Sequence, residues 1–260
     1  MFDSVRAMFQ SLRRQFFTPD HQNLRQFMTP VDDQDSPTQC NSCTAFAVTA
    51  TIEGTYNKAN SASPVMLNAR KLFNEAGPPL KCKASHWWPD HALAHAVSNG
   101  LEQTNFPAAP RIKIRGYQYL IGSNLNQTQK KMKVWINSTG PVVAVLVQYY
   151  DLGSTWSKDW TKTYPGSANT KVYFPGASLP ASGTPGEPGA IVGGHVVSIA
   201  GYDDRSSPSF WICKNSWNNT WNGDGYVYIA QSEDRVHGAP NGNGIGTCYI
   251  DLIDVWGVVF

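Results

Sequence analysis

At Cys40-Asn41-Ser42-Cys43-Thr44-Ala45-Phe46 the chain enters an apolar run that continues to Ile52. This pattern predicts a helix that begins at Ser42 or Cys43. The N-terminus of a helix carries about half a positive charge, which stabilises a thiolate relative to a thiol. Because the thiolate is the attacking form of cysteine, Cys43 is a candidate nucleophile.

A nucleophilic cysteine needs a base to take its proton, and the base needs a group that orients it. His195 is the candidate base and lies in the apolar stretch Gly194–Tyr202. Asn215 is the candidate orienting group, because its carbonyl oxygen can accept a hydrogen bond from the far ring nitrogen of a histidine. Taken singly, a Cys or a His of this kind is more often a core residue, but the combination indicates a thiol hydrolase.

Three blocks of the sequence resemble the papain family of cysteine peptidases, of the cathepsin/papain type. Thr29–Gln34 with Cys40–Phe46 resembles the family's oxyanion glutamine and nucleophile loop. Gly194–Tyr202 resembles its histidine strand. Lys214–Trp217, with the following Trp221–Tyr226, resembles its asparagine strand and hairpin. The local signature of this family, with the histidine and asparagine downstream, is well defined.

The resemblance implies an α+β fold with an N-terminal helical lobe, a C-terminal antiparallel β lobe and an active-site cleft between them. It implies a peptidase that acts through a thiolate–imidazolium pair and an acyl-enzyme intermediate, with no metal and no other cofactor. The implied catalytic residues are Gln34, Cys43, His195 and Asn215. The implied substrate-binding residues are Trp87, Trp88, Pro89, Val145, Gly194 and Trp217. The implied partners are a polypeptide substrate and protein inhibitors of the cystatin type, and the resemblance also implies a Cys40–Cys82 disulfide.

The chain departs from the family pattern at four places, one of which is Asn41, where the family usually has Gly. Thr44 stands where the family has Trp after the nucleophile, and three residues are inserted between Gln34 and Cys43. His86–Pro89 stands where the family has a Gly-Gly pair before the substrate-binding rim. The bulk of this stretch predicts an unusual specificity, and diversion of the acyl-enzyme to deamidation or ligation of a specific protein target stays open.

Two other hypotheses stay open beside catalysis by Cys43. The four residues Cys40, Cys43, Cys82 and His86 have a spacing that also fits a structural zinc site, although such a site would leave the His195 and Asn215 blocks unexplained. A papain-fold binding protein without turnover is the other alternative. The remaining cysteines, Cys213 and Cys248, are expected either to pair or to be buried thiols.

Composition and charge narrow the function classes. The chain has 260 residues, of which 41% are hydrophobic, so it can bury a sizeable core. Its net charge of +2 without a basic run argues against nucleic acid as a partner. No run approaches the roughly 18 apolar residues of a membrane span, and no secretion signal follows Met1. We expect a monomer from a secreted, periplasmic or lysosome/vacuole-like compartment.

The chain divides near Gly140-Pro141, so that residues 28–140 would form the helical lobe and residues 141–260 the β lobe. Before this point, one helix is predicted to start at Ser63-Pro64 and stop at Gly77, and another to run from Pro89 to Asn99. After it, short β-branched or aromatic runs predict strands, and a long loop is predicted before His195. These strands are Val142–Val147, Val196–Ala200, Phe210–Lys214 and Tyr226–Ala230, and the loop is Tyr164–Gly194.

Residues 1–27 are predicted to form an amphipathic helix and a lead-in segment. An apolar stripe with helical spacing runs through Phe2, Val5, Phe9, Leu12 and Phe16. We expect this helix to pack on the β lobe, with Thr18–Asn23 partly covering the cleft. A purely structural helix is the alternative.

Overall fold

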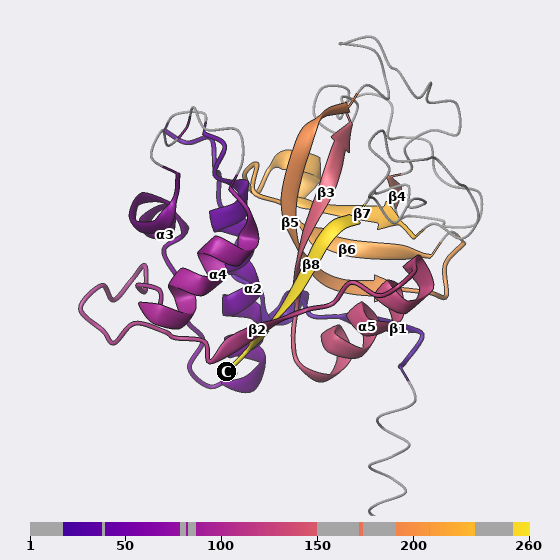
Figure 1. Cartoon of the computed structure of the whole chain (residues 1–260), viewed down its shortest axis with the longest axis horizontal. Coiled ribbons are helices and arrows are strands. Elements are labelled where there is room, and N and C mark those ends of the chain that lie inside the picture. The colour runs from indigo at the N-terminus through magenta and orange to yellow at the C-terminus, as the bar shows by residue number, and fades with distance from the viewer. Residues whose placement is uncertain are drawn as a thin grey trace, which may run out of the picture.

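The computed structural model describes residues 18–37, 40–78, 82, 87–149, 172–173, 191–207, 209–231 and 252–260. Figure 1 shows a group of helices beside a strongly twisted sheet. The predicted N-terminal helix, His86 and Cys248 lie outside the described residues. Within the described ranges, no helix has the length and apolar character needed to cross a membrane.

Helices α2 (Cys43–Ala59) and α4 (Pro89–Ser98) confirm two predicted helices. Ser42 is the N-cap of α2, so Cys43 is its first residue. Pro89 is the first residue of α4, where its missing N–H costs no hydrogen bond. Gly100 follows the C-cap Asn99 with φ of +71°, a left-handed conformation that glycine adopts easily.

Helix α3 (Ala69–Ala76) ends before Gly77 as predicted, but the predicted start at Ser63-Pro64 is wrong. The N-cap is Asn68, whose side chain accepts a hydrogen bond from the Lys71 N–H. The preceding residues are drawn into hydrogen bonds with α2: the Val65 N–H donates to Asn57 Oδ1 and the Leu67 N–H donates to Glu53 Oε1. These tertiary contacts override the local N-cap and proline signal.

The strands of the described residues form one eight-stranded sheet in the order β2-β8-β3-β5-β6-β7-β4, with β1 paired to β5. Their pairs are antiparallel except β4 with β7, which is parallel. The strands are β1 (His21–Asn23), β2 (Gly116–Tyr119), β3 (Val142–Tyr149), β4 (Val172–Tyr173), β5 (Ile191–Asp203), β6 (Phe210–Lys214), β7 (Tyr226–Ala230) and β8 (Leu252–Val259). The bounds predicted for β6 and β7 are confirmed, and β3 and β5 are longer than predicted.

The loop predicted from Tyr164 to Gly194 is wrong at two places. Val172 and Tyr173 form β4, and β5 already starts at Ile191. Pairing explains the early start of β5, because Gly193 and Gly194 lie opposite Gln148 and Val147 of β3. Glycine in a sequence argues against a strand, but here the pairing between β3 and β5 continues through Gly193 and Gly194. The other residues of the predicted loop lie outside the described ranges.

The lead-in segment does not cover the cleft. β1 pairs with Gly201–Asp203 at the end of β5, and the Tyr202 hydroxyl donates to the Pro19 carbonyl at 2.9 Å. This end of β5 is about 20 Å from His195 at the usual strand rise of roughly 3.3 Å per residue. The hypothesis that Thr18–Asn23 covers the cleft is therefore wrong, because backbone pairing holds this segment elsewhere.

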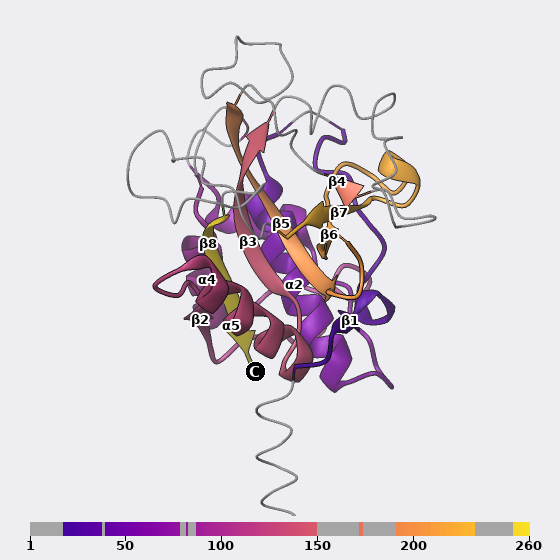
Figure 2. The ribbon, with the colours of Figure 1, turned by 90° about the vertical axis from the view of Figure 1, so that its right-hand side faces the viewer.

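The two faces of the central sheet pack against different helices, and Figure 2 shows α2 on one side and α5 (Leu125–Ser138) on the other. Val143 and Val145 belong to the core that contains α2 and α4. Leu146, with the opposite side-chain direction, belongs to the core that contains Ile136 of α5. Helix α5 comes before Gly140-Pro141 in the chain, yet it packs on the sheet. The boundary between the two lobes at Gly140-Pro141 stays a prediction.

The packing of α5 on the sheet gives the first prediction. A Cβ added at Gly257 of β8 would overlap the Trp135 ring of α5, whereas a Cβ added at Gly116 of β2 meets nothing within 4 Å. Gly257→Ala should lower the free energy of unfolding by about 1–3 kcal/mol, because the helix must move. Gly116→Ala should change it by less than about 0.5 kcal/mol. Urea unfolding measures both, and equal effects would contradict the close contact.

Candidate active site

Cys43 stands where α2 meets β5. Cys43 is the first residue of α2, and this helix packs against β5, the strand that carries His195. Burial raises the pKa of the Cys43 thiol, and hydrogen bonding by the backbone of Val196 and Thr44 lowers it without cancelling the effect of burial. Because Val196 directly follows His195, the thiol lies beside the histidine strand.

His195 is buried, with 3% of its surface exposed, and its strand position is opposite Leu146 of β3. Its Nε2 lies 2.7 Å from Asn215 Oδ1. A carbonyl oxygen can only accept, so Nε2 carries the proton and Nδ1 remains as the basic ring nitrogen. Burial lowers the pKa of His195 to about 4, although the hydrogen bond to Asn215 opposes this shift.

Asn215 follows the last residue of β6 and is itself buried. Its N–H donates to the Gly225 carbonyl at 3.1 Å. The Trp217 ring stacks on the His195 ring, with centroids 4.7 Å apart and an interplanar angle of 28°. Trp221 meets Trp217 edge-on at 5.0 Å. The Trp217 ring therefore covers the imidazole and shields its bond to Asn215 from water, and Trp221 supports the Trp217 ring.

Gln34 lies in the same region, and both atoms of its side-chain amide are held. Its Oε1 accepts from Ser216 Oγ at 2.6 Å, and its Nε2 donates to the Cys40 carbonyl at 3.1 Å. The Gln34 N–H donates to the Ser216 carbonyl at 2.8 Å. Ser216 follows Asn215, and Cys40 belongs to the nucleophile loop. One of the two Nε2 protons is used by Cys40, which leaves one amide N–H for a ligand.

The Cys40–Cys82 disulfide is present, with a sequence separation of 42. It uses two of the four residues that the zinc hypothesis requires, so that hypothesis is wrong. Cys213 is a buried free thiol, which is one of its two predicted states, and Cys248 lies outside the described residues. Among the residues that the structure describes, no group of three or more His, Cys, Asp and Glu could hold a metal ion.

The predicted substrate-binding residues divide into exposed and covered positions. Trp88 is 41% exposed and Gly194 is exposed, whereas Val145 is only 4% exposed and packs in the core that contains Trp87. Thr44 Oγ1 donates to the Trp87 carbonyl at 2.5 Å. Thr44, which stands where the family has Trp, thus links the start of α2 to the segment that leads into α4. The substrate role of these residues stays a prediction.

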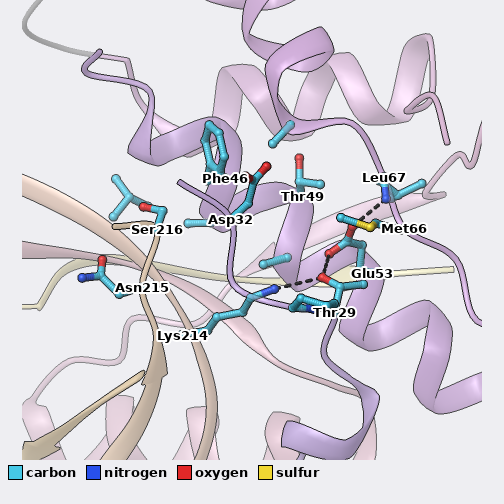
Figure 3. Close-up of a pocket in the computed structure, with 15 residues that line it drawn as sticks. Thr29, Asp32, Phe46, Thr49, Glu53, Met66, Leu67, Lys214, Asn215 and Ser216 are labelled. Carbon is cyan, nitrogen blue, oxygen red and sulfur yellow. Dashed lines mark hydrogen bonds between the residues drawn. The ribbon is translucent and has the colours of Figure 1, made fainter. Parts of the chain in front are cut away.

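A small cavity behind the site holds a polar cluster that the sequence analysis missed, shown in Figure 3. Lys214 Nζ donates to Thr29 Oγ1 at 2.9 Å, and this hydroxyl donates to Glu53 Oε2 at 2.5 Å. Burial raises the pKa of Glu53 and lowers the pKa of Lys214. The positive charge of Lys214 opposes the shift of Glu53, and the negative charge of Glu53 opposes the shift of Lys214. A Glu inside the apolar stretch of α2 was the available signal, because a buried carboxylate needs a partner.

Comparison with known proteins identifies the family. Residues 18–248 match the model of the papain family cysteine proteases. This chain belongs to the papain family of cysteine proteases. It is 24% identical over 235 residues to cysteine proteinase 3 of Entamoeba histolytica, covering 85% of this chain and 65% of that protein. It is 24% identical over 228 residues to fruit bromelain of Ananas comosus, covering 80% and 54%. The chain thus spans between about half and two thirds of the length of these curated relatives.

Solved structures of the family confirm the predicted α+β fold. The bromelain protease of Ananas comosus in complex with the E64 inhibitor superposes with a TM-score of 0.61 at 20% identity, covering 93% of this chain and 99% of that one. Procathepsin L2 proteinase from the larval midgut of Tenebrio molitor gives a TM-score of 0.62 at 22% identity, covering 93% and 68%. At these identities the likeness shows the papain fold.

The burial of His195 gives a prediction on protonation. In a Cys43→Ala variant, where no thiolate can pair with the imidazolium, His195 should titrate near pH 4 because burial disfavours its charge. The unfolded chain would take up this proton near pH 6.5, so the free energy of unfolding should fall as the pH drops from about 6.5 to about 4.

Imidazole NMR between pH 3 and 8 measures the titration. A second variant that also carries His195→Gln serves as the control, because it should lose this part of the pH dependence of stability and keep the part that comes from the carboxylates. A pKa near 6.5 for His195 in the Cys43→Ala protein would contradict the burial that the structure shows.

Proposed function

We propose that this protein is a cysteine peptidase that hydrolyses peptide bonds with Cys43 as nucleophile, His195 as base and acid, and Asn215 as the group that orients His195. The observation that carries the proposal is the buried 2.7 Å contact between His195 Nε2 and Asn215 Oδ1 under the Trp217 ring. It selects the tautomer whose free nitrogen, Nδ1, can accept the proton of a thiol. The place of Cys43 at the start of α2, which packs against the strand that carries His195, supports Cys43 as the donor of that proton.

The first step is a proton transfer from Cys43 Sγ to His195 Nδ1. Burial disfavours either charge alone, so a lone thiolate and a lone imidazolium are both unfavourable. A transfer between them creates both charges together, and each then stabilises the other. The N-terminus of α2 adds a positive potential at the sulfur. The thiolate–imidazolium pair is therefore the reactive form.

The thiolate then attacks the carbonyl carbon of the substrate peptide, and the carbonyl oxygen becomes an oxyanion. Two donors are suited to it: the Cys43 N–H, which as the first N–H of α2 has no acceptor within the helix, and the unused Gln34 Nε2 proton. His195 protonates the leaving amine as the C–N bond breaks, which leaves a thioester on Cys43. A water molecule, deprotonated by His195, attacks this thioester and releases the carboxylic acid and the thiol.

The proposed substrate is a polypeptide bound between the helices and the sheet, in the cleft that the family fold provides. The exposed Trp88 ring supports binding of an apolar substrate residue. The bromelain relative was solved with the E64 inhibitor, and the same reagent is proposed to label Cys43 here. Inhibition by cystatin-type proteins and a monomeric state remain proposals, and the Cys40–Cys82 disulfide supports an oxidising compartment such as a secreted, periplasmic or lysosome-like one.

The roles proposed for the catalytic residues predict unequal losses. Cys43→Ala should abolish cleavage of peptide substrates, because no covalent route remains. Asn215→Ala should leave measurable turnover, because the base is present but poorly oriented. Steady-state kinetics on a fluorogenic peptide, with the melting temperature of each variant as a folding control, measure both. Near wild-type cleavage by Cys43→Ala would contradict the mechanism.

The products separate hydrolysis from its alternatives. Mass spectrometry of a cleaved peptide should show addition of one water. Transfer of the acyl group to an added amine or release of ammonia from a glutamine side chain, without hydrolysis, would indicate ligation or deamidation instead. A protein that E-64 labels at no site and that cleaves no member of a peptide library would be the binding protein without turnover.

The rim residues predict a substrate preference. A peptide with an aliphatic or aromatic residue at the second position before the scissile bond should be favoured, because burying such a side chain against the exposed Trp88 ring is worth roughly 1.5–3 kcal/mol. A peptide-library cleavage profile measures this preference. A dominant preference for acidic residues at that position would contradict the apolar rim.

A further inference from the structure

The described part of the segment between Gln34 and Cys43 makes several hydrogen bonds of its own. The N–H groups of Asp35 and Ser36 donate to Asp33, at 3.0 Å to Oδ1 and at 3.3 Å to the carbonyl. The Cys40 N–H donates to Asp35 Oδ1 at 3.2 Å, and the Ser42 N–H donates to the Cys40 carbonyl at 2.8 Å. None of these bonds uses a backbone group of Gln34, so the position of its backbone depends on contacts from outside the segment.

Arg70, in α3, supplies such contacts on both sides of Gln34. Its Nη2 donates to the Asp33 carbonyl at 2.6 Å and to the Ser36 carbonyl at 2.9 Å. Its Nε also donates to the Ser36 carbonyl, at 3.2 Å. A single guanidinium group thus clamps the carbonyl one residue before Gln34 and the carbonyl two residues after it.

The guanidinium group is itself held in place. Its Nη1 donates to Asp32 Oδ2 at 2.8 Å, and its carbon lies 5.3 Å from the centroid of the Phe46 ring in α2. The ion pair with Asp32 is partly exposed and would contribute little by itself. Hydrogen bonds from a charged donor to backbone carbonyls are stronger than neutral ones, and the planar fork of arginine can serve two acceptors at once.

The opposite side of the same segment is attached to the sheet part of the fold. Asp33 pairs with Trp217 in an isolated β-bridge, and the Gln34 N–H donates to the Ser216 carbonyl. Gln34 is therefore held between Arg70 on the helical side and the residues that follow Asn215 on the other side. Any shift of the backbone at Asp33 or Ser36 would move the Gln34 amide relative to Cys43.

We propose that Arg70 is a positioning residue for the reaction: by clamping the carbonyls of Asp33 and Ser36, it holds the Gln34 side-chain amide where the oxyanion forms. This inference rests on the proposed function, and in particular on the oxyanion role of Gln34. Arg70 itself does not touch the reacting atoms. Its effect on the rate passes through Gln34 alone, and a double-mutant cycle measures this property.

The test uses the variants Arg70→Met, Gln34→Ala and their combination, assayed for kcat and KM on a fluorogenic peptide. Arg70→Met should lower kcat/KM about tenfold or more, mainly through kcat, because a misplaced donor stabilises the oxyanion poorly. In the Gln34→Ala background the same substitution should change kcat/KM by less than about twofold, since the group that it positions is already absent. Equal losses in the two backgrounds, or no loss in either, would overturn the inference.

Alkylation of Cys43 by iodoacetamide provides a second readout. This reagent reacts by displacement of iodide and forms no oxyanion. Cys43 of the Arg70→Met variant should therefore be alkylated at the wild-type rate. A parallel loss of alkylation and turnover would show a general disturbance of the site and would overturn the inference. Alkylation also counts the active protein in each preparation, which corrects the kinetic constants for loss of folded enzyme.

Two further variants separate the clamp from other effects of a charge. Arg70→Lys keeps the charge but cannot hold both carbonyls with one planar group, so it should not restore kcat, and full recovery would contradict the clamp. Arg111→Met is the matched control, because Arg111 also pairs with a carboxylate, that of Glu75, and with a backbone carbonyl, that of Gly100, without contacting Gln34 or its neighbours. It should leave kcat unchanged, and a loss of kcat equal to that of Arg70→Met would count against the inference.

The outcomes also separate this inference from the proposed function. If the wild type cleaves no peptide, or Cys43→Ala cleaves as well as the wild type, the proposed function fails. If the wild type cleaves, Cys43→Ala does not, and the cycle between Arg70 and Gln34 is additive, only the role of Arg70 fails.

Discussion

The hydrogen bond between the buried His195 imidazole and the Asn215 side chain is the contact on which the rest of the site depends. Sheet pairing brings the two residues together: β5 and β6 are antiparallel, with Ser198 opposite Lys214, so the chain leaves β6 beside the strand that carries His195. A buried polar pair without this bond would be strongly unfavourable. The fold therefore accepts a histidine in its core only in the orientation that leaves Nδ1 free for a thiol.

The same segment links the helices to the sheet. Lys214 reaches Glu53 of α2 through the Thr29 hydroxyl, and Ser216 holds both the backbone and the side chain of Gln34. Cys43 is the first residue of α2, and this helix packs against β5. Residues on both sides of Asn215 thus fix the helix that carries the nucleophile and the loop that carries the oxyanion glutamine. One set of buried contacts therefore both positions the catalytic residues and holds the helices against the sheet.

The sequence predicted the elements that have a strong local pattern and missed those decided by tertiary contacts. The apolar run after Cys43 predicted the start of α2 correctly, and the β-branched and aromatic run Phe210–Lys214 predicted both bounds of β6. The start of α3 was misplaced because Glu53 and Asn57 draw Val65–Leu67 into extended hydrogen bonds. Strand β2, which pairs with β8, was missed. Helix α5 was missed although it carries local signals: the N-cap Asn124 side chain accepts from the Gln127 N–H, and Met132 and Ile136 are buried at helical spacing. The hydrogen-bond partners of Gln34, and the hydrogen bonds from Arg70 to the Asp33 and Ser36 carbonyls, have no signal in the sequence.

The most direct test of the account is the pH dependence of Cys43 alkylation by iodoacetamide, with peptide mapping to assign the modified cysteine. If His195, held by Asn215, takes the proton of the thiol, Cys43 should react at pH 5.5 at least about a hundredfold faster than free cysteine, whose pKa of about 8.5 leaves little thiolate at that pH. Cys213, a buried thiol outside the site, should stay unmodified. A Cys43 rate that stays low until pH 9 or above would contradict the account, because the thiol would then behave as an ordinary buried cysteine.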